Sequence, residues 1–341
     1  MTTYQYPLNE ELQAIERELM PSLTLDDPIF SIMPIVNVDA ALLSWEIPNN
    51  ITGLQGLRGL GGQPGNVTAL GGNRYTVRPG VYGEFMTVDE EEMTVRRQYG
   101  SFNLPIDVSD LVMDRQTQLL QRRMDRIKYI GWTLVATGTF SVSNANSGVV
   151  HTDTFDLQDY NASTWSTAST ATPLADFRAM KLLERGHGVS FGGRARAYMN
   201  QTTFNYLTAN TNAADIGGKR VTGLAQPIGL AATNSVLLDE DLPQIVIYDG
   251  GYLDSSGTFT LFLPTNKVIV VGARPGGQSI ADYAMTRNAN NPNSAPGSYS
   301  FVNDRTSGPN KTVPPLIEVH DGHNGGPRIY YPNAIVDMDV S

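Results

Sequence analysis

Residues 106–137 read IDVSDLVMDRQTQLLQRRMDRIKYIGWTLVAT and form the longest uninterrupted helical pattern in the chain. The stretch has no proline, and Asp107 and Ser109 offer side-chain oxygens that can cap a first turn. Apolar residues recur at the i, i+4 and i+7 spacing of one helix face. They are Leu120, Met124, Ile127, Gly131 and Leu134, extended toward the N-terminus by Val112, Met113 and Leu119. The pattern predicts one helix over 107–137, roughly 45 Å long at about 1.5 Å per residue.

The composition limits the classes of protein to which the chain can belong. It has 341 residues, 40% of them hydrophobic and 17% charged, which suffices for a large core in one or two domains. No apolar run approaches the roughly 18 residues of a membrane helix, and the N-terminus lacks the pattern of a signal peptide. We therefore expect a cytosolic product without a membrane partner.

The absence of cysteine excludes disulfides, thiolate metal sites and cysteine nucleophiles. The net charge of -10 argues against a protein that reads nucleic-acid sequence, because such proteins need a basic face to neutralise phosphates. The 33 glycines and 20 prolines indicate many turns and irregular loops.

The region before the long helix divides into an arm and a hairpin. Residues 9–20 predict a short amphipathic helix with Leu12 and Ile15 on its apolar face, ended by Pro21. We expect this arm to lie across something larger, although a helix packed on its own domain fits the pattern equally well. Residues 51–99 are first glycine-rich and then alternate like a strand, which fits a long hairpin. Its apolar edge comprises Leu54, Leu57 and Leu60.

Charged runs near the long helix are more typical of solvated or partner-facing surfaces than of metal sites. The run from Asp89 to Glu92, which includes Glu90 and Glu91, is expected to face water or a partner, with metal binding as the lesser alternative. The second half of the long helix carries four cations, Arg122, Arg123, Arg126 and Lys128.

The region after the long helix mixes hairpins, helices and strands. Hairpins are predicted over 140–155 and 252–263, and helices over 173–184 and 197–207. Strands are predicted over 244–248, 267–271, 316–320 and 328–340, and the run of Val and Ile in 267–271 predicts burial on both faces. The segment DGHNGG between the last two strands is predicted as a turn.

Catalytic and cofactor motifs fail on inspection. No phosphate-binding loop or dinucleotide fingerprint is complete, and no nucleophile elbow exists. His320, Asp321 and His323 have the residue types of a metal or hydrolase site, but their glycine-rich context favours a turn. We therefore predict no catalytic, cofactor or metal site. A soluble hydrolase that uses these three residues is the alternative from another functional class.

Two stretches resemble a known family. Residues 99–140, YGSFNLPIDVSDLVMDRQTQLLQRRMDRIKYIGWTLVATGTF, resemble the spine-helix region of the lambda-like major capsid proteins of tailed double-stranded-DNA bacteriophages. FLPTNKVIVVGARPGG, residues 262–277, is similar to that family's segment of proline, buried strand and glycine. The order of arm, glycine-tipped hairpin, long helix, mixed α/β region and C-terminal strand also matches the family.

The resemblance implies an α+β fold of the Hong Kong 97 type. Its parts would be an N-terminal arm at 1–45, an extended β-hairpin called the E-loop at 51–99, a peripheral domain with the spine helix, and a mixed α/β axial domain. The peripheral domain would span 100–171 plus 313–341, and the axial domain 172–312. The implied role is a major head protein that self-assembles as pentamers and hexamers into an icosahedral virion shell.

The expected partners follow from the same resemblance. They are other copies of the chain, a separate scaffolding protein, a portal, a decoration protein and packaged double-stranded DNA without sequence-specific contact, with assembly in the host cytoplasm. The E-loop has no lysine, since the first lysine is Lys128, so a lysine cross-link cannot form from it. A nanocompartment shell of the same fold is the nearest alternative. The predicted assembly contacts are Leu12, Ile15, Leu54, Leu57, Leu60, Glu90, Glu91, Arg122 and Arg126.

Overall fold

The chain divides into two units, each built from three separate segments. The computed structural model describes residues 9–48, 53–67, 71–96, 107–144, 148–209, 229–274, 279–306 and 309–341. Unit 1 comprises Met1–Leu43, Arg78–Gly131 and Asp282–Arg328. Unit 2 comprises Ser44–Val77, Trp132–Ala281 and Ile329–Ser341. The predicted domain limits group the residues differently, since the C-terminal strands are divided between the two units.

The long helix is confirmed. Helix α4 spans Val108–Thr137, and the Asp107 side chain accepts a hydrogen bond from the backbone N–H of Ser109 at 3.1 Å. The predicted apolar face is buried at Leu120, Met124, Ile127 and Leu134. Met113 is an error in the predicted stripe, because its side chain is exposed. In the described chain, no helix combines the length and apolar character needed to span a membrane.

The sheet of unit 1 is organised around one long strand, of which the sequence predicted only the two ends. Strand β15 (Ile317–Ile329) runs straight through DGHNGG, so the predicted turn is wrong. Its residues 317–323 pair with β14 (Ser298–Asp304), and residues 317–325 pair with β4 (Gly80–Val88); both strands are antiparallel to it. Strand β15 also neighbours β13 (Ala281–Met285), which in turn pairs with β1 (Ile35–Asn37). Glycine is needed at position 322, where a Cβ atom would collide with the backbone carbonyl oxygen of Tyr82 on β4.

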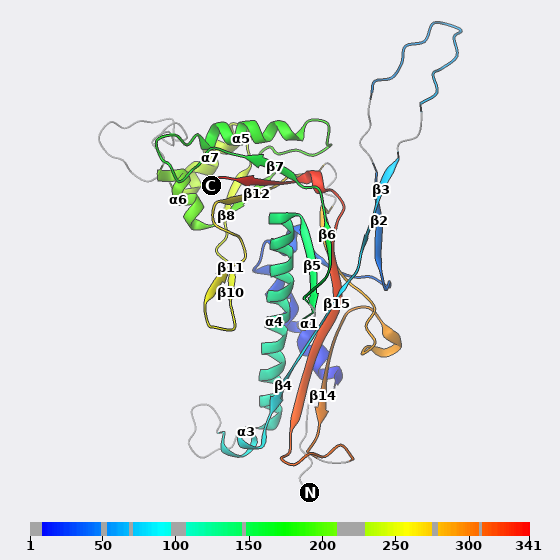
Figure 1. The fold of residues 1–341 in the computed structure, drawn as a ribbon, viewed down its shortest axis with the longest axis vertical. Helices are drawn as coiled ribbons and strands as arrows, with labels where there is room; N and C mark the ends of the chain where they lie inside the picture. Colours follow the sequence, from blue (N-terminus) through cyan, green and yellow to red (C-terminus); the bar gives the residue numbers. More distant parts are fainter. Residues whose placement is uncertain are drawn as a thin grey trace. The chain divides into compact units, whose positions relative to one another are not determined.

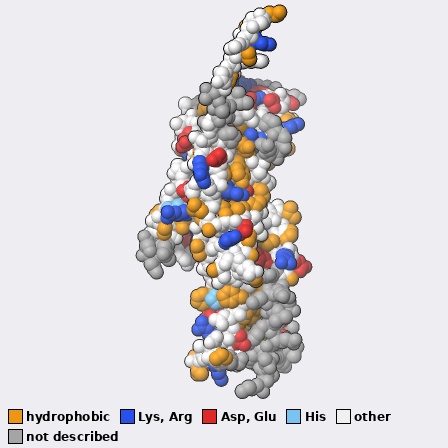
Figure 2. Space-filling model, turned by 90° about the vertical axis from the view of Figure 1, so that its right-hand side faces the viewer, with side chains coloured by type: hydrophobic (Ala, Val, Ile, Leu, Met, Phe, Trp, Pro, Cys, Tyr) orange, Lys and Arg blue, Asp and Glu red, His pale blue; other side chains and the backbone are white. Residues whose placement is uncertain are grey.

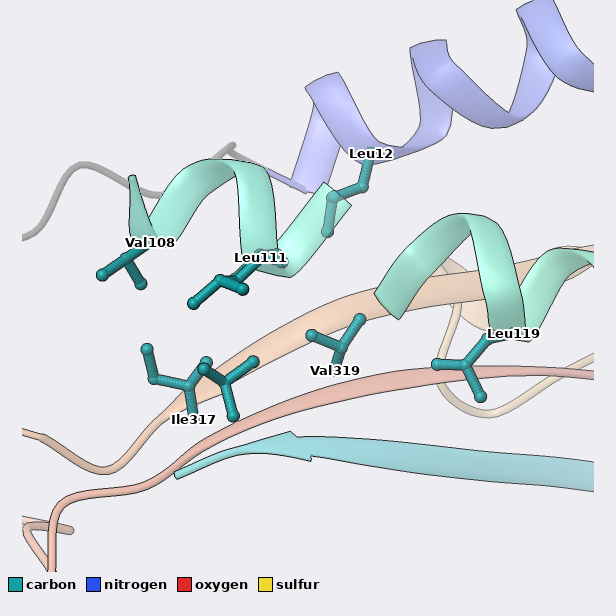
Figure 3. Close-up of a cluster of buried hydrophobic side chains, with 8 residues drawn as sticks. Leu12, Val108, Leu111, Leu119, Ile317 and Val319 are labelled. Carbon is teal, nitrogen blue, oxygen red and sulfur yellow. The ribbon is translucent and has the colours of Figure 1, made fainter. Parts of the chain in front are cut away.

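Two helices cover one face of this sheet and enclose a core (Figure 1). Helix α1 (Asn9–Leu25) contributes Leu12, and α4 lies beside it over the strands (Figure 3). The cluster of buried apolar side chains consists of Leu12, Val88, Val108, Leu111, Val112, Leu119, Ile317 and Val319. The predicted end of α1 at Pro21 is wrong. Around the proline, the hydroxyls of Ser22 and Thr24 donate to the carbonyls of Leu19 and Met20, which helps the helix to continue.

Gly131 allows α4 to approach the short helix α2 (Ile29–Ile32) closely. A Cβ atom at position 131 would lie 2.7 Å from side-chain carbons of Ile29 and of Met33. We expect Gly131→Leu to lower the free energy of unfolding by at least about 2 kcal/mol, because a larger side chain overpacks this contact. Chemical denaturation of the soluble protein measures the loss. Gln121→Leu, at an exposed position of the same helix, should change stability by no more than about 0.5 kcal/mol, and equal losses in both variants would contradict the packing argument.

Unit 2 contains a second five-stranded sheet. Its strand order is β7 (Gln158–Asn161), β16 (Ile335–Asp339), β12 (Lys267–Val271), β8 (Arg196–Met199) and β9 (Gln244–Ile247). The predicted burial of the 267–271 strand is confirmed, since Val268, Ile269 and Val270 are fully buried. The predicted helix over 197–207 is wrong at residues 197–199, where β8 pairs with both β9 and β12, and the helix begins at Gln201. Among the described residues, this unit contains the helices α5 (Pro173–Lys181), α6 (Gln201–Ala209) and α7 (Leu230–Asp239), together with the end of α4 from Trp132 onward.

Hairpins account for the remaining strands. The pairs β5 (Thr139–Asn144) with β6 (Gly148–Thr154), and β10 (Gly251–Leu253) with β11 (Phe259–Leu261), confirm the two short predicted hairpins. The long predicted hairpin has different arms. Strand β2 (Leu43–Pro48) pairs with β3 (Gly72–Val77), whereas β4 belongs to the sheet of unit 1 and leads into helix α3 (Glu90–Val95).

Candidate assembly surfaces and a buried charge cluster

The loop between β2 and β3 carries leucine side chains that contact nothing else in the described chain. Leu54, Leu57 and Leu60 are 100%, 105% and 110% exposed. Figure 2 shows hydrophobic side chains along this extended loop at the top of the view. We call residues 53–67 the leucine loop. Full burial of one leucine side chain stabilises an interface by about 1.5–3 kcal/mol, so this edge is suited to a partner surface.

The ribbon that carries the leucine loop is anchored at its base in unit 2. The Trp45 ring stacks on Tyr75 and Phe155 at centroid distances of 5.9 and 6.1 Å. Its indole Nε1 also donates to the carbonyl oxygen of Ile329 at 2.9 Å. These contacts hold the base of the β2–β3 ribbon in place, although the loop itself is exposed.

The acidic run caps a helix. Asp89 accepts a hydrogen bond from the backbone N–H of Glu92 at 2.9 Å, and the next residues form the first turn of α3, where carboxylates are favoured by the helix dipole. Glu90 and Glu91 are exposed, as predicted for a solvated or partner-facing patch. Glu92 is paired with Arg115. Among the described residues, no group of side chains is arranged to hold a metal ion.

The two arginines predicted as contacts lie on the exposed side of α4. Arg122 donates from Nε and Nη2 to the two carboxylate oxygens of Glu84 at 2.6 and 2.9 Å, and this hydrogen-bonded pair lowers the pKa of Glu84. The guanidinium of Arg126 lies 5.9 Å from the centre of the Tyr129 ring. Both arginines are accessible to another subunit, and their role as contacts stays a prediction.

The two predicted contacts on α1 differ in accessibility. Ile15 is half-buried, whereas Leu12 is completely buried in the core of unit 1. In this conformation Leu12 has no surface to offer another subunit, and we remove it from the set of assembly contacts. The alternative that the sequence left open, a helix packed on its own domain, describes α1.

A buried charge cluster joins α1, α4 and the sheet of unit 1. Arg123 is 5% exposed and donates from Nη1 to Asp321 at 2.9 Å and from Nη2 to Glu16 at 2.5 Å. The Ser298 hydroxyl donates to the same Glu16 oxygen. The expectation that Arg123 meets water or a neighbouring subunit is therefore wrong. Arg123 lies on the buried face of α4, at helical spacing from Gln116, Leu120 and Ile127. This spacing could have predicted its burial, but its charge suggested an exposed position.

The surroundings of this cluster shift two pKa values in opposite directions. Burial raises the pKa of Asp321 to about 7, and the nearby Glu16 and Glu84 carboxylates add to the effect against the attraction of Arg123. Burial and Arg123 lower the pKa of His323 to about 3, so this imidazole is neutral near neutral pH. His323 hydrogen-bonds the Tyr283 hydroxyl at 2.9 Å.

The three residues of the hydrolase alternative do not converge on one site. Side chains alternate between the two faces of a strand. Asp321 and His323 point toward α4 and β13, whereas His320 stacks between Phe85 and Phe301 at 5.2 and 4.7 Å. The Asp321 carboxylate forms an ion pair with Arg123. A catalytic acid or base must lie within hydrogen-bond reach of its partner, and this arrangement does not provide that.

The comparisons with known proteins agree with this architecture. The model of the family described as phage major capsid protein E matches residues 48–299. No match was found among curated protein sequences. A prophage protein from E. coli CFT073, described as a capsid protein, aligns with a TM-score of 0.61 and 13% identity over 99% of this chain and 100% of its own. A phage-related protein from Bordetella bronchiseptica RB50 aligns with a TM-score of 0.55 and 10% identity over 98% of both chains.

The mature capsid of bacteriophage PhiM1 has the same fold, with a TM-score of 0.52 and 9% identity over 91% of this chain and 86% of that chain. The fold is the α+β Hong Kong 97 type, as predicted. The family match covers most of the sequence, so the chain belongs to the phage major capsid protein E family. It is a structural shell protein of a tailed bacteriophage, and the nanocompartment alternative is not favoured.

Proposed function

We propose that the chain assembles as pentamers and hexamers into a closed icosahedral shell that encloses double-stranded DNA. The observation that carries this proposal is the leucine loop, whose apolar side chains have no partner within the described subunit. Water exposure of three neighbouring leucines is unfavourable, and contact with another subunit removes it. The proposed role is structural and non-enzymatic.

The contacts that hold this shell are non-covalent. The chain has no cysteine for disulfides, and the leucine loop has no lysine for a cross-link. Stability then depends on many weak contacts that act together around each capsomer. Ile15, Glu90, Glu91, Arg122 and Arg126 are further proposed members of this contact set.

The remaining partners and the place of assembly belong to the same proposal. A separate scaffolding protein guides assembly in the host cytoplasm, and a portal and a decoration protein complete the virion. The net charge of -10 disfavours tight binding of packaged DNA, because like charges repel. A protein that reads DNA sequence needs a basic face, which this net charge disfavours, so the proposed contact with DNA is not sequence-specific.

The leucine loop provides the test of shell assembly. We expect the triple variant Leu54→Ser, Leu57→Ser, Leu60→Ser to fold normally but to yield no closed shells when co-expressed with the scaffolding protein. Electron microscopy and sedimentation measure assembly, and circular dichroism measures folding. Leu25→Ser is the matched control, since Leu25 is 83% exposed on α1 and should not affect assembly. Normal shells from the triple variant would refute the role of the loop.

A further inference from the structure

We propose that docking of helix α1 onto unit 1 is a pH-dependent switch, in which the docked helix retains one proton that the released helix gives up. The switch consists of Glu16, Arg123 and Asp321. It operates within one subunit, so it does not depend on the proposed shell contacts.

The charges in the cluster do not balance. One guanidinium serves two carboxylates, because Nη1 of Arg123 binds Asp321 and Nη2 binds Glu16. All three residues are less than 10% exposed. With both carboxylates ionised, the docked state therefore buries one net negative charge, which is costly away from water. A single proton on the carboxylate pair removes this excess.

Release of α1 also balances the charges. When the helix leaves, Glu16 enters water, and Arg123 and Asp321 remain as a neutral pair. Few contacts oppose the release. Among the described side chains of α1, Leu12 and Glu16 alone are buried, and the others are half-buried or exposed. Elements with few buried contacts are those that open locally at low free-energy cost.

The other cations near the cluster are not buried with it. Arg126 is exposed to water, and its guanidinium lies over the Tyr129 ring. Arg122 is paired with Glu84 on β4. His323 on β15 is neutral near neutral pH because burial and Arg123 lower its pKa to about 3. The groups that face the cluster from the surrounding elements are Tyr82 and Glu84 on β4, Arg122 and Arg126 on α4, Tyr283 on β13, Ser298 and Tyr299 on β14, and His323 on β15.

The direction of the pH effect follows from the proton count. In the docked state, burial raises the pKa of Asp321 to about 7, so the pair holds a proton below that pH. In the released state the surplus carboxylate is in water, where carboxyl groups are ionised above about pH 5, so it holds no such proton. Between about pH 5 and 7 the docked state binds one more proton, and its equilibrium with the released state falls by up to tenfold per pH unit as pH rises. Above about pH 7 the ratio levels off.

Spin labels can measure this equilibrium in the unassembled full-length protein. The chain has no cysteine, so Ala14→Cys on α1 and Gln121→Cys on α4 create two unique labelling sites at exposed positions. The distance distribution between the labels gives the ratio of docked to released helix. The measurement is made in the Leu12→Ala background, where the loss of a buried side chain weakens docking enough to populate both states. We expect the ratio to fall at least tenfold from pH 5.5 to pH 8.

Matched charge variants separate the switch from a general pH effect. Glu16→Gln and Asp321→Asn each remove the surplus carboxylate, and each should make the ratio the same at pH 5.5 and pH 8. Glu18→Gln removes an exposed carboxylate from the same helix and should preserve the tenfold change. A ratio in the Leu12→Ala protein that does not change with pH overturns the proposal, as does a helix that stays docked at both pH values. Retention of the change in Glu16→Gln also overturns it.

Discussion

Replacement of Arg123 with methionine should lower the free energy of unfolding by about 3–5 kcal/mol at pH 8. The variant keeps a long apolar side chain but leaves Glu16 and Asp321 as buried carboxylates without their cation. Removal of one partner from a buried ion pair costs this much because the remaining charge has neither water nor a counter-ion. Denaturant unfolding of the soluble subunit measures the loss. It should be smaller at pH 5.5, where the unpaired carboxylates can take up protons.

Arg122→Met is the control for this prediction. Arg122 is the neighbouring residue on α4, and it forms two hydrogen bonds to Glu84, yet the two side chains are 60% and 51% exposed. Water already solvates both groups, so the loss should not exceed about 1 kcal/mol. A similar loss in the two variants would show that burial does not decide the contribution of Arg123.

Local patterns in the sequence predicted the elements whose structure depends on local contacts. Helix α4 was predicted within one residue because thirty residues without proline repeat one apolar face. Strand β12 was predicted with its correct bounds because a short run of Val and Ile is typical of a strand buried on both faces. The two short hairpins were predicted because their turns lie between alternating segments.

Errors occurred where distant pairing decides the structure. The glycines of DGHNGG favour a turn locally, but β14 and β4 flank residues 317–323 on both sides and hold them extended. Residues 197–199 look helical in isolation, and they form β8 because β9 and β12 supply partners. Propensity is a weak prior that tertiary context overrides.

The candidate sites also divide into one that local sequence predicted and one that depends on residues far apart in the sequence. Exposure of the leucine loop was predictable, because regularly spaced leucines among glycines cannot fold back into a core. The charge cluster was not predicted, because its members are separated by 107 and 198 positions in the sequence. Charge alone suggested that Arg123 faces water. Its helical register, shared with Leu120 and Ile127, carried the opposite information.

Ile127→Asp should prevent unit 1 from folding, and the protein should be recovered as insoluble material. Ile127 is 0% exposed and lies one helical turn before Gly131, which packs against α2. The substitution removes a buried apolar side chain, at a cost of about 2–5 kcal/mol, and introduces a carboxylate into the core. Arg123, one turn earlier on the same face, is already paired with Glu16 and Asp321. The combined loss is comparable to the whole stability of a typical domain, about 5–15 kcal/mol.

Gln121→Asp places the same carboxylate on the exposed face of α4 and should leave the protein soluble, with a loss of no more than about 1 kcal/mol. The soluble fraction after expression and the circular dichroism of purified protein compare the two variants. Equal yields would mean that the face at Ile127 is not buried, because a carboxylate is tolerated at that position only where water reaches it. Loss of Ile127→Asp alone would establish that the apolar face of α4, rather than its length or charge, holds unit 1 together.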